Sequence, residues 1–229
     1  QGTIAANSRD GLTIQNRAND RLPGLLADIP YSIVVESNVP LGATLAHYDL
    51  GGSLGDSFTA TGASEWTFAR VERTAGVSND FAVFYNLNTF DVDVTLTAYQ
   101  NGQTFNIATQ RVGGQRRGGW SINDTNLAGL LPRGIFSIKL TATPASSANT
   151  ATFQGIVASL SHYTNDAAFG LLGDSNGGAT TGIITNITQG PQVSSEVVLF
   201  NPGSTTATVS LTGTYVTGNL PNFSRQITI

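Results

Sequence analysis

Apolar and polar residues alternate along most of this chain with a period of two, and the alternating stretches are bounded by Gly, Asn, Asp or Pro. This pattern predicts β-strands that bury one face. We expect strands at residues 32–36, 42–49, 65–70, 81–87, 92–99, 104–111, 136–142, 151–162, 196–200, 207–215 and 224–229.

One hairpin is marked especially clearly, at Asn101-Gly102. Asn-Gly supplies the two positive φ angles of a type I′ turn, so the strands on either side of it are expected to pair. No long stretch repeats its apolar residues with the 3.6-residue period of a helix, so the pattern predicts an all-β chain.

The chain also contains an internal repeat. Ala46-His47-Tyr48 returns as Ser161-His162-Tyr163, which places the only two histidines 115 positions apart. Further matches pair residues 54–57 with 172–175, 80–86 with 195–201, 94–97 with 209–212, 11–14 with 119–122 and 31–33 with 136–138. The repeat predicts tandem sandwiches and not one large domain.

The predicted fold is therefore a tandem array of immunoglobulin-like antiparallel β-sandwiches. We expect residues 1–50 to be the C-terminal half of one repeat, 51–165 a unit of full repeat length, and 166–229 the N-terminal half of the next. The alternative is two sandwich domains with boundaries near 50–65 and 164–180.

The apolar strand that ends in Phe84-Tyr85-Asn86, its counterpart Phe200-Asn201-Pro202, the Val-Thr-Leu-Thr strand at 94–97 and the strand that ends in His162-Tyr163 carry a resemblance. Together they resemble the tandem β-sandwich repeats of large bacterial secreted and surface proteins. The resemblance implies stalks, coats or adhesive filaments, and it implies no catalytic residue.

Composition narrows the classes of function. Charged residues make up 11% of the chain and the net charge is −4, so the clustered Lys and Arg of a nucleic-acid-binding surface are missing and we expect no such partner. The chain has no Cys, which excludes disulfides and thiolate metal sites and favours a prokaryotic source. No apolar run is long enough to span a membrane. Because the chain begins at Gln1 and contains no Met, we expect it to be a processed or excerpted piece.

Metal ligands are sparse. Asp56 and Asp174, each in a Gly-Asp-Ser loop, are weak candidates for Ca²⁺, and the favoured interpretation is a turn aspartate that caps its own backbone. His47 and His162 lie in different repeats, so we expect each imidazole to hydrogen-bond a neighbouring loop and not to bind a metal. We predict no other cofactor.

Other polar and aromatic residues have a structural interpretation. Asp91 and Asp93 form a carboxylate pair that would discourage pairing at a sheet edge. Trp66 and Phe68 share a strand face and are expected in the core and not in a sugar-stacking platform. The single Lys, Lys139, has Val34 or Val35 at its counterpart, so a repeated isopeptide bond is not expected. The glycosylation candidates are Asn123, Asn186 and Asn222.

The sequence predicts a non-enzymatic structural protein of the cell surface or exterior that self-assembles into a layer, stalk or filament. Its expected partner is a copy of itself. The alternatives are a carbohydrate-binding or adhesion module, which would bind glycans, and a viral coat or fibre component.

Overall fold

The structure is a computed structural model of the 229-residue chain. It describes residues 4–8, 32–39, 43–49, 52–57, 59, 61–165, 167–175, 177, 179–184, 191, 195–213 and 223–228. The chain divides into two compact units, Gln1–Glu36 and Ser37–Ile229. The described residues of the first unit, 4–8 and 32–36, carry no strand, and every described strand lies in the second unit.

The described residues fold into antiparallel strands and two short 3-10 helices, which confirms the all-β prediction. The strands are β1 (Thr44–Asp49), β2 (Gly52–Ser57), β3 (Glu65–Arg73), β4 (Ser78–Asn86), β5 (Val92–Gln100), β6 (Gln103–Val112), β7 (Arg117–Ser121), β8 (Gly134–Pro144), β9 (Ile156–Thr164), β10 (Ala168–Leu172), β11 (Asp174–Ser175), β12 (Thr208–Gly213) and β13 (Phe223–Thr228). The helices are η1 (Thr125–Leu127) and η2 (Ser147–Thr152).

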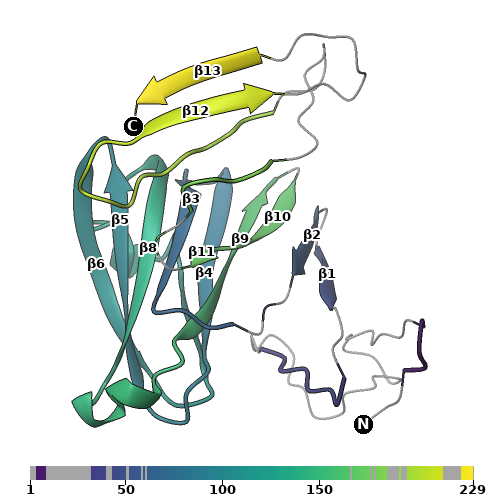
Figure 1. Cartoon of the computed structure of the whole chain (residues 1–229). Helices are drawn as coiled ribbons and strands as arrows, with labels where there is room; N and C mark the ends of the chain where they lie inside the picture. Colours follow the sequence, from purple (N-terminus) through teal and green to yellow (C-terminus); the bar gives the residue numbers. More distant parts are fainter. Residues whose placement is uncertain are drawn as a thin grey trace. The chain divides into compact units, whose positions relative to one another are not determined.

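Two sheets form a β-sandwich between residues 61 and 175. One has the order β10-β9-β4-β7 and the other β11-β3-β8-β5-β6. The sheets face each other around a single apolar core (Figure 1). Alternation explains why these strands bury one face each. Along β5, for example, Val92, Val94, Leu96 and Ala98 are fully buried.

The outer strands of the sandwich are arranged differently from those of an immunoglobulin domain. In the immunoglobulin order the first strand pairs with the second, and the last pairs with the strand before it. Here β3 pairs with β8 and not with β4, and β9 pairs with β4 and not with β8. The immunoglobulin-like order is therefore not confirmed by this sandwich.

Two further hairpins form separate two-stranded sheets: β1–β2 and β12–β13. They lie on either side of the sandwich in the sequence. The predicted Asn101-Gly102 turn is confirmed, because both residues have positive φ, 51° and 74°, between β5 and β6.

Several predicted strands differ from the observed ones. Residues 32–36 and 196–200 are not strands, although 33–35 and 197–200 are apolar. Residues 151–155 precede β9, and residues 147–152 form η2. The strands β2, β7, β10 and β11 were not predicted, and β7 follows directly on a turn rich in Gly and Arg. In the part of the chain that the structure describes, no helix is long and apolar enough to cross a membrane.

Candidate functional site

A buried His–Asp pair links the two central strands of the four-stranded sheet. His162 on β9 lies directly opposite Asp80 on β4, and its Nδ1 is 2.6 Å from Asp80 Oδ1. The Glu72 backbone N–H donates to Asp80 Oδ2 at 2.8 Å. The Phe169 ring stacks on the imidazole at 4.5 Å between centroids. The expected hydrogen bond of His162 is present, but its partner is a strand residue and not a loop.

Burial dominates the electrostatics of this pair. Desolvation raises the pKa of the Asp80 carboxyl above its ordinary value, while the Glu72 N–H and His162 oppose the rise. Both side chains lie within the sandwich interior and are closed off from solvent. The pair therefore ties β4 to β9 and is not open to a substrate.

Of the two calcium candidates, the structure describes the side chain of Asp174. Asp174 is exposed in β11, and its backbone carbonyl accepts a hydrogen bond from Thr67 Oγ1. Among the described residues, no group of three or more His, Asp or Glu side chains could hold an ion. The side chains of His47 and Asp56 lie outside the described part of the chain. Calcium binding at Asp56 or Asp174 stays a prediction.

The carboxylate pair has a different role from the expected one. Asp93 lies on β5, between β8 and β6, so it is not on an edge strand. Arg111 on β6 donates two bonds of 2.9 Å to its two carboxylate oxygens. This contact lowers the pKa of Asp93, and Asp91 lies exposed before the strand. The edge-protecting role predicted for Asp91 and Asp93 is wrong.

Trp66 and Phe68 are both in the core, as predicted, and each is 2% exposed. The Trp66 indole N–H donates to the Ile156 carbonyl at 2.7 Å and so joins β3 to β9. Lys139 forms an ion pair with Glu65, its Nζ 3.3 Å from the carboxylate.

Of the glycosylation candidates, only Asn123 is described. Its side-chain amide donates to the Ser78 carbonyl. Asn186 and Asn222 lie outside the described residues, and glycosylation stays a prediction at all three positions.

Two buried asparagines close one end of the sandwich, and the sequence did not identify them as a network. The Asn86 amide donates to the carbonyls of Phe90, Val112 and Gly113. Its oxygen accepts from the backbone and side-chain amides of Asn88. Asn88 also bonds Gly155 and Gln154, ahead of β9. This network holds three loops together without any charge.

The same local turn occurs at Asn201, 115 residues after Asn86. At Asn86, the side chain donates to the carbonyl four residues on (2.8 Å) and accepts from the N–H two residues on (2.9 Å). Asn201 makes the equivalent bonds to Thr205 (2.8 Å) and Gly203 (3.0 Å). The shared geometry supports the repeat read from the sequence.

The first hairpin also repeats part of the sandwich. In β1–β2, His47 is opposite Leu54, and in β9–β10, His162 is opposite Phe169. Both members of the pair move by 115 positions, so the two hairpins have the same register. The sequence match of residues 54–57 with 172–175 does not follow this register, because Leu172 is opposite Ser159 and not His162.

The hairpin β12–β13 is compared with β5–β6 in the same way. Val94 is opposite Gln110, and Val209 is opposite Ile227. The first strand moves by 115 positions and the second by 117.

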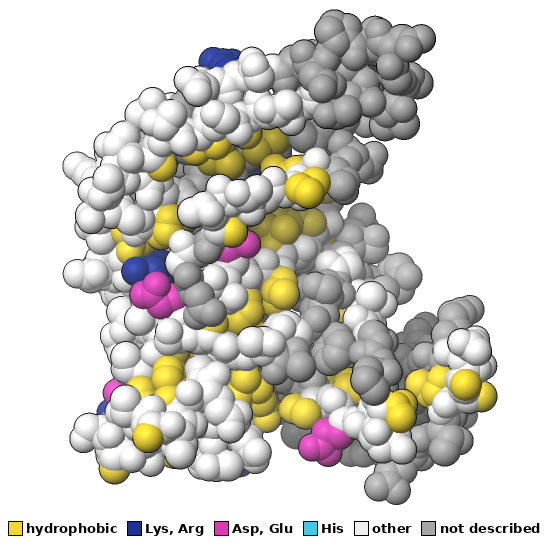
Figure 2. Space-filling view, viewed as in Figure 1, with side chains coloured by type: hydrophobic (Ala, Val, Ile, Leu, Met, Phe, Trp, Pro, Cys, Tyr) yellow, Lys and Arg dark blue, Asp and Glu magenta, His cyan; other side chains and the backbone are white. Residues whose placement is uncertain are grey.

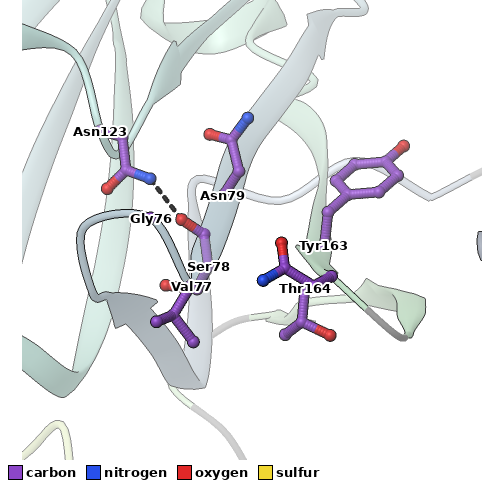
Figure 3. Close-up of a pocket in the computed structure, with 8 residues that line it drawn as sticks. Gly76, Val77, Ser78, Asn79, Asn123, Tyr163 and Thr164 are labelled. Atoms are coloured by element: carbon purple, nitrogen blue, oxygen red, sulfur yellow. Dashed lines mark hydrogen bonds between the residues drawn. The ribbon is translucent and has the colours of Figure 1, made fainter. Parts of the chain in front are cut away.

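A shallow pocket of about 390 Å³ lies at the start of β4 and the end of β9 (Figure 3). Its lining carries no charged side chain and includes Ser78, Asn79, Asn123, Tyr163 and Asn165. Asn79 and Tyr163 are direct cross-strand partners, so both side chains belong to the outward face of the sheet.

The outward face of the four-stranded sheet continues this neutral character. Phe81 packs edge-on against Tyr163, with centroids 6.0 Å apart, and Val83 and Tyr85 follow on the same side of β4. These side chains are half-buried. Figure 2 shows that, on the face it views, uncharged surface predominates and charged side chains stand at scattered points.

Comparisons with known proteins identify no family. No protein-family model matches the chain, and no curated protein gives a significant match. Solved structures give weak likenesses. The crystal structure of Thermotoga maritima 1070 is 13% identical, with a TM-score of 0.40, and the match covers 52% of this chain and 98% of that one. The Anabaena sensory rhodopsin transducer is 16% identical, with a TM-score of 0.34, over 44% and 83%. At these scores neither likeness carries an argument.

Proposed function

We propose that this chain is a structural protein of the cell surface or exterior, built from repeated sandwiches related to the immunoglobulin type, that assembles with itself into a layer, stalk or filament. The observation that carries the proposal is the register shared by β1–β2 and β9–β10. A hairpin with the register of part of a closed sandwich, 115 residues away, supports the proposal of a further copy of that sandwich.

The chemistry of the outer surface supports this role. The outward side of the five-stranded sheet carries hydroxyl contacts such as Thr95 with Thr109, 3.0 Å apart, and ion pairs such as Asp93 with Arg111 that are satisfied within the chain. A face of this kind packs against a neighbour without leaving an unpaired charge buried.

Electron microscopy of the purified chain at near-physiological salt tests the proposal. We expect filaments or sheets with a regular spacing of one or two sandwiches. The eleven residues of β8 make each sandwich about 36 Å long along its strands. Dispersed monomers at high protein concentration would exclude self-assembly.

A second candidate function is glycan binding at the pocket beside Tyr163. Neutral amides and hydroxyls donate and accept hydrogen bonds in the way sugar hydroxyls require, and an aromatic ring packs on the apolar face of a sugar. The uncharged lining and the neighbouring Phe81 favour a neutral saccharide.

A glycan array probed with the whole chain tests this second function. We expect binding that is lost in Asn79→Ala and Tyr163→Ala and kept in Asn106→Ala, an exposed position on β6 in the other sheet. An array without binding, or equal binding by all three variants, would exclude a site at this pocket.

A further inference from the structure

The outward face of the four-stranded sheet carries a line of uncharged side chains along β4. Strand β4 buries every second residue from Ser78 to Asn86, so Asn79, Phe81, Val83 and Tyr85 point to the opposite side. These four residues form the β4 line. Asn79 lies in the pocket at one end of the line (Figure 3), and Tyr85 is six positions further along the strand. At about 3.4 Å per residue, the line is about 20 Å long.

Small residues border the middle of the β4 line on both sides. Phe81 lies between Ser161 on β9 and Ser121 on β7, and Val83 lies between a serine of β9 and Gly119 on β7. Because these neighbours have a short side chain or none, they leave the flanks of Phe81 and Val83 open, and both side chains are only half-buried. An extended ligand can therefore pack along this line.

The β4 line ends beside a basic side chain. Arg117 on β7 lies directly opposite Tyr85 in the ladder, so both side chains belong to the outward face of the sheet. The four strands of this sheet are described throughout, and their other ionisable residues of this kind, Asp80 and His162, point to the interior. Arg117 is thus the one charged side chain that these strands place on the outward face.

The charge of Arg117 has no counterpart in the described part of the chain. The other half-buried basic side chains among the described residues each have an oxygen partner: Glu72 for Arg70, Glu65 for Lys139 and the Leu131 carbonyl for Arg73. No described oxygen contacts the Arg117 guanidinium. Burial lowers the pKa of Arg117, and no carboxylate opposes this effect. A half-buried cation is stabilised by an anion that accepts its hydrogen bonds, so the donors of Arg117 are available to an anionic ligand.

The chemistry of the ligand follows from the β4 line and Arg117 together. Aromatic rings such as those of Phe81 and Tyr85 pack on the apolar faces of sugars, and the amides and hydroxyls beside them exchange hydrogen bonds with sugar hydroxyls. A guanidinium binds a carboxylate through two parallel hydrogen bonds. A neutral glycan would leave Arg117 unpaired, and an acidic peptide would bring many carboxylates to a face that has one cation. A glycan with sparse carboxylates matches both features.

We propose that the outward face of the four-stranded sheet binds an extended acidic oligosaccharide. Its neutral units lie along the β4 line from the pocket to Tyr85, and the carboxylate of a uronic acid unit binds Arg117. This inference rests on the second candidate function, glycan binding at the pocket, and names the class of glycan.

Isothermal titration calorimetry of the whole chain with a matched pair of glycans tests the carboxylate contact. The acidic probe is a hexasaccharide of alternating glucuronic acid and N-acetylglucosamine, and the neutral probe is the same hexasaccharide with its carboxyl groups reduced to alcohols. We expect the native chain to bind the acidic probe at least about tenfold more tightly, because only this probe pairs the half-buried guanidinium.

Two arginine variants assign this preference to one position. Arg117→Gln should bind the two probes equally. Arg116→Gln removes the same charge from the neighbouring, exposed position and should keep the preference of the native chain. Because each protein is compared with itself on two probes, a change in the stability of a variant does not imitate the expected result.

The outcomes separate this inference from glycan binding itself. A native chain that binds both probes equally, or a preference that survives in Arg117→Gln, would overturn the carboxylate contact. If Tyr163→Ala abolished that equal binding, glycan binding at the pocket would stand and only the acidic class would be removed. A chain that binds neither probe and no glycan on the array would remove both. Poly-glutamate bound as tightly as the acidic probe would overturn the proposal, because carboxylates without sugars would then be enough.

The far end of the β4 line provides a second measurement. Tyr85→Ala should weaken binding of the neutral hexasaccharide about threefold or more, because it removes a ring from the path of the sugar chain. Tyr99→Ala, which removes a half-buried tyrosine from the outward face of the other sheet, is the control and should bind like the native chain. Unchanged binding by Tyr85→Ala would limit the site to the pocket and overturn the extended mode of binding.

Discussion

At the scale of single residues, the side-chain amides of Asn86 and Asn88 hydrogen-bond the loops at one end of the sandwich, a role that charged groups have in other proteins. They satisfy six backbone groups at one end of the sandwich without a desolvated charge. The sequence pointed to Asn86 only as the end of a Tyr-Asn motif. Its recurrence as Asn201 was the available signal, but its partners near Val112 are far away in the sequence and could not be inferred.

Asn86→Ala should lower the free energy of unfolding by about 2–4 kcal/mol, because it leaves several buried backbone carbonyls without a donor. Asn86→Asp should do no better, since a carboxylate cannot donate. Asn201→Ala is the matched control and should change stability by less than about 1 kcal/mol. Urea unfolding followed by Trp fluorescence measures all three. Equal losses at positions 86 and 201 would contradict the role of the buried network.

The Asp80–His162 pair makes stability depend on pH. Because burial raises the pKa of Asp80, the folded state holds that proton more tightly than the unfolded state does. The resulting stabilisation is fully present below the ordinary Asp pKa of about 3.9 and is lost as the pH rises through the folded value.

Asp80→Asn keeps an acceptor for the Glu72 N–H and removes this titration. The free energy of unfolding of the native chain, relative to that of Asp80→Asn, should therefore fall as the pH rises from about 4, by at most about 1.4 kcal/mol per pH unit. Asp124→Asn, an exposed turn position, is the control and should run parallel to the native chain. If the free energies of unfolding of Asp80→Asn and of the native chain changed in parallel with pH, the interpretation of Asp80 as a buried carboxyl with a raised pKa would be refuted.

At the scale of elements, glycine explains why some strands escaped prediction. Residues 117–121 were not predicted as a strand, yet they form β7 beside β4. A Cβ at Gly118 would come within 2.5 Å of the Phe84 ring, so glycine is what allows this strand to lie there. Alternation predicted β5 and β8 well, because one face of each is buried and the other is not.

Gly118→Ala should cost about 1–3 kcal/mol of stability through overpacking against Phe84. Gly129→Ala is its control, since a Cβ there meets nothing within 4 Å and should be neutral or slightly stabilising. Thermal unfolding by circular dichroism compares the two. A Gly118→Ala protein as stable as the native chain would show that the Phe84 ring can move aside.

The opposite error, predicting strands where none is observed, has another cause. Residues 32–36 and 196–200 have the composition of strands but are not paired. Their counterparts β8 and β4 are central in their sheets, with a neighbour on each side. Propensity predicts an element only when its partners are present, because a strand gains most of its stability from pairing and burial.

At the scale of the whole molecule, residues 61–175 contain every strand of both larger sheets and the whole apolar core. This fragment expressed alone should fold and unfold cooperatively in urea, because every strand of both larger sheets lies within it. Urea unfolding followed by Trp fluorescence measures this property. A fragment that is unfolded would show that the sandwich needs residues outside 61–175.

The pairing of the strands in the sandwich has a consequence for the order in which the protein is made. During synthesis from the N-terminus, β3 to β6 emerge before β7 to β11. At that stage β5–β6 is the one ladder of the sandwich whose two strands are both present, because β3 pairs with β8 and β11, and β4 pairs with β7 and β9. The apolar faces of β3 and β4 therefore stay without a partner sheet until β8 and β9 follow, which makes this interval the point at which a nascent chain is most exposed to aggregation.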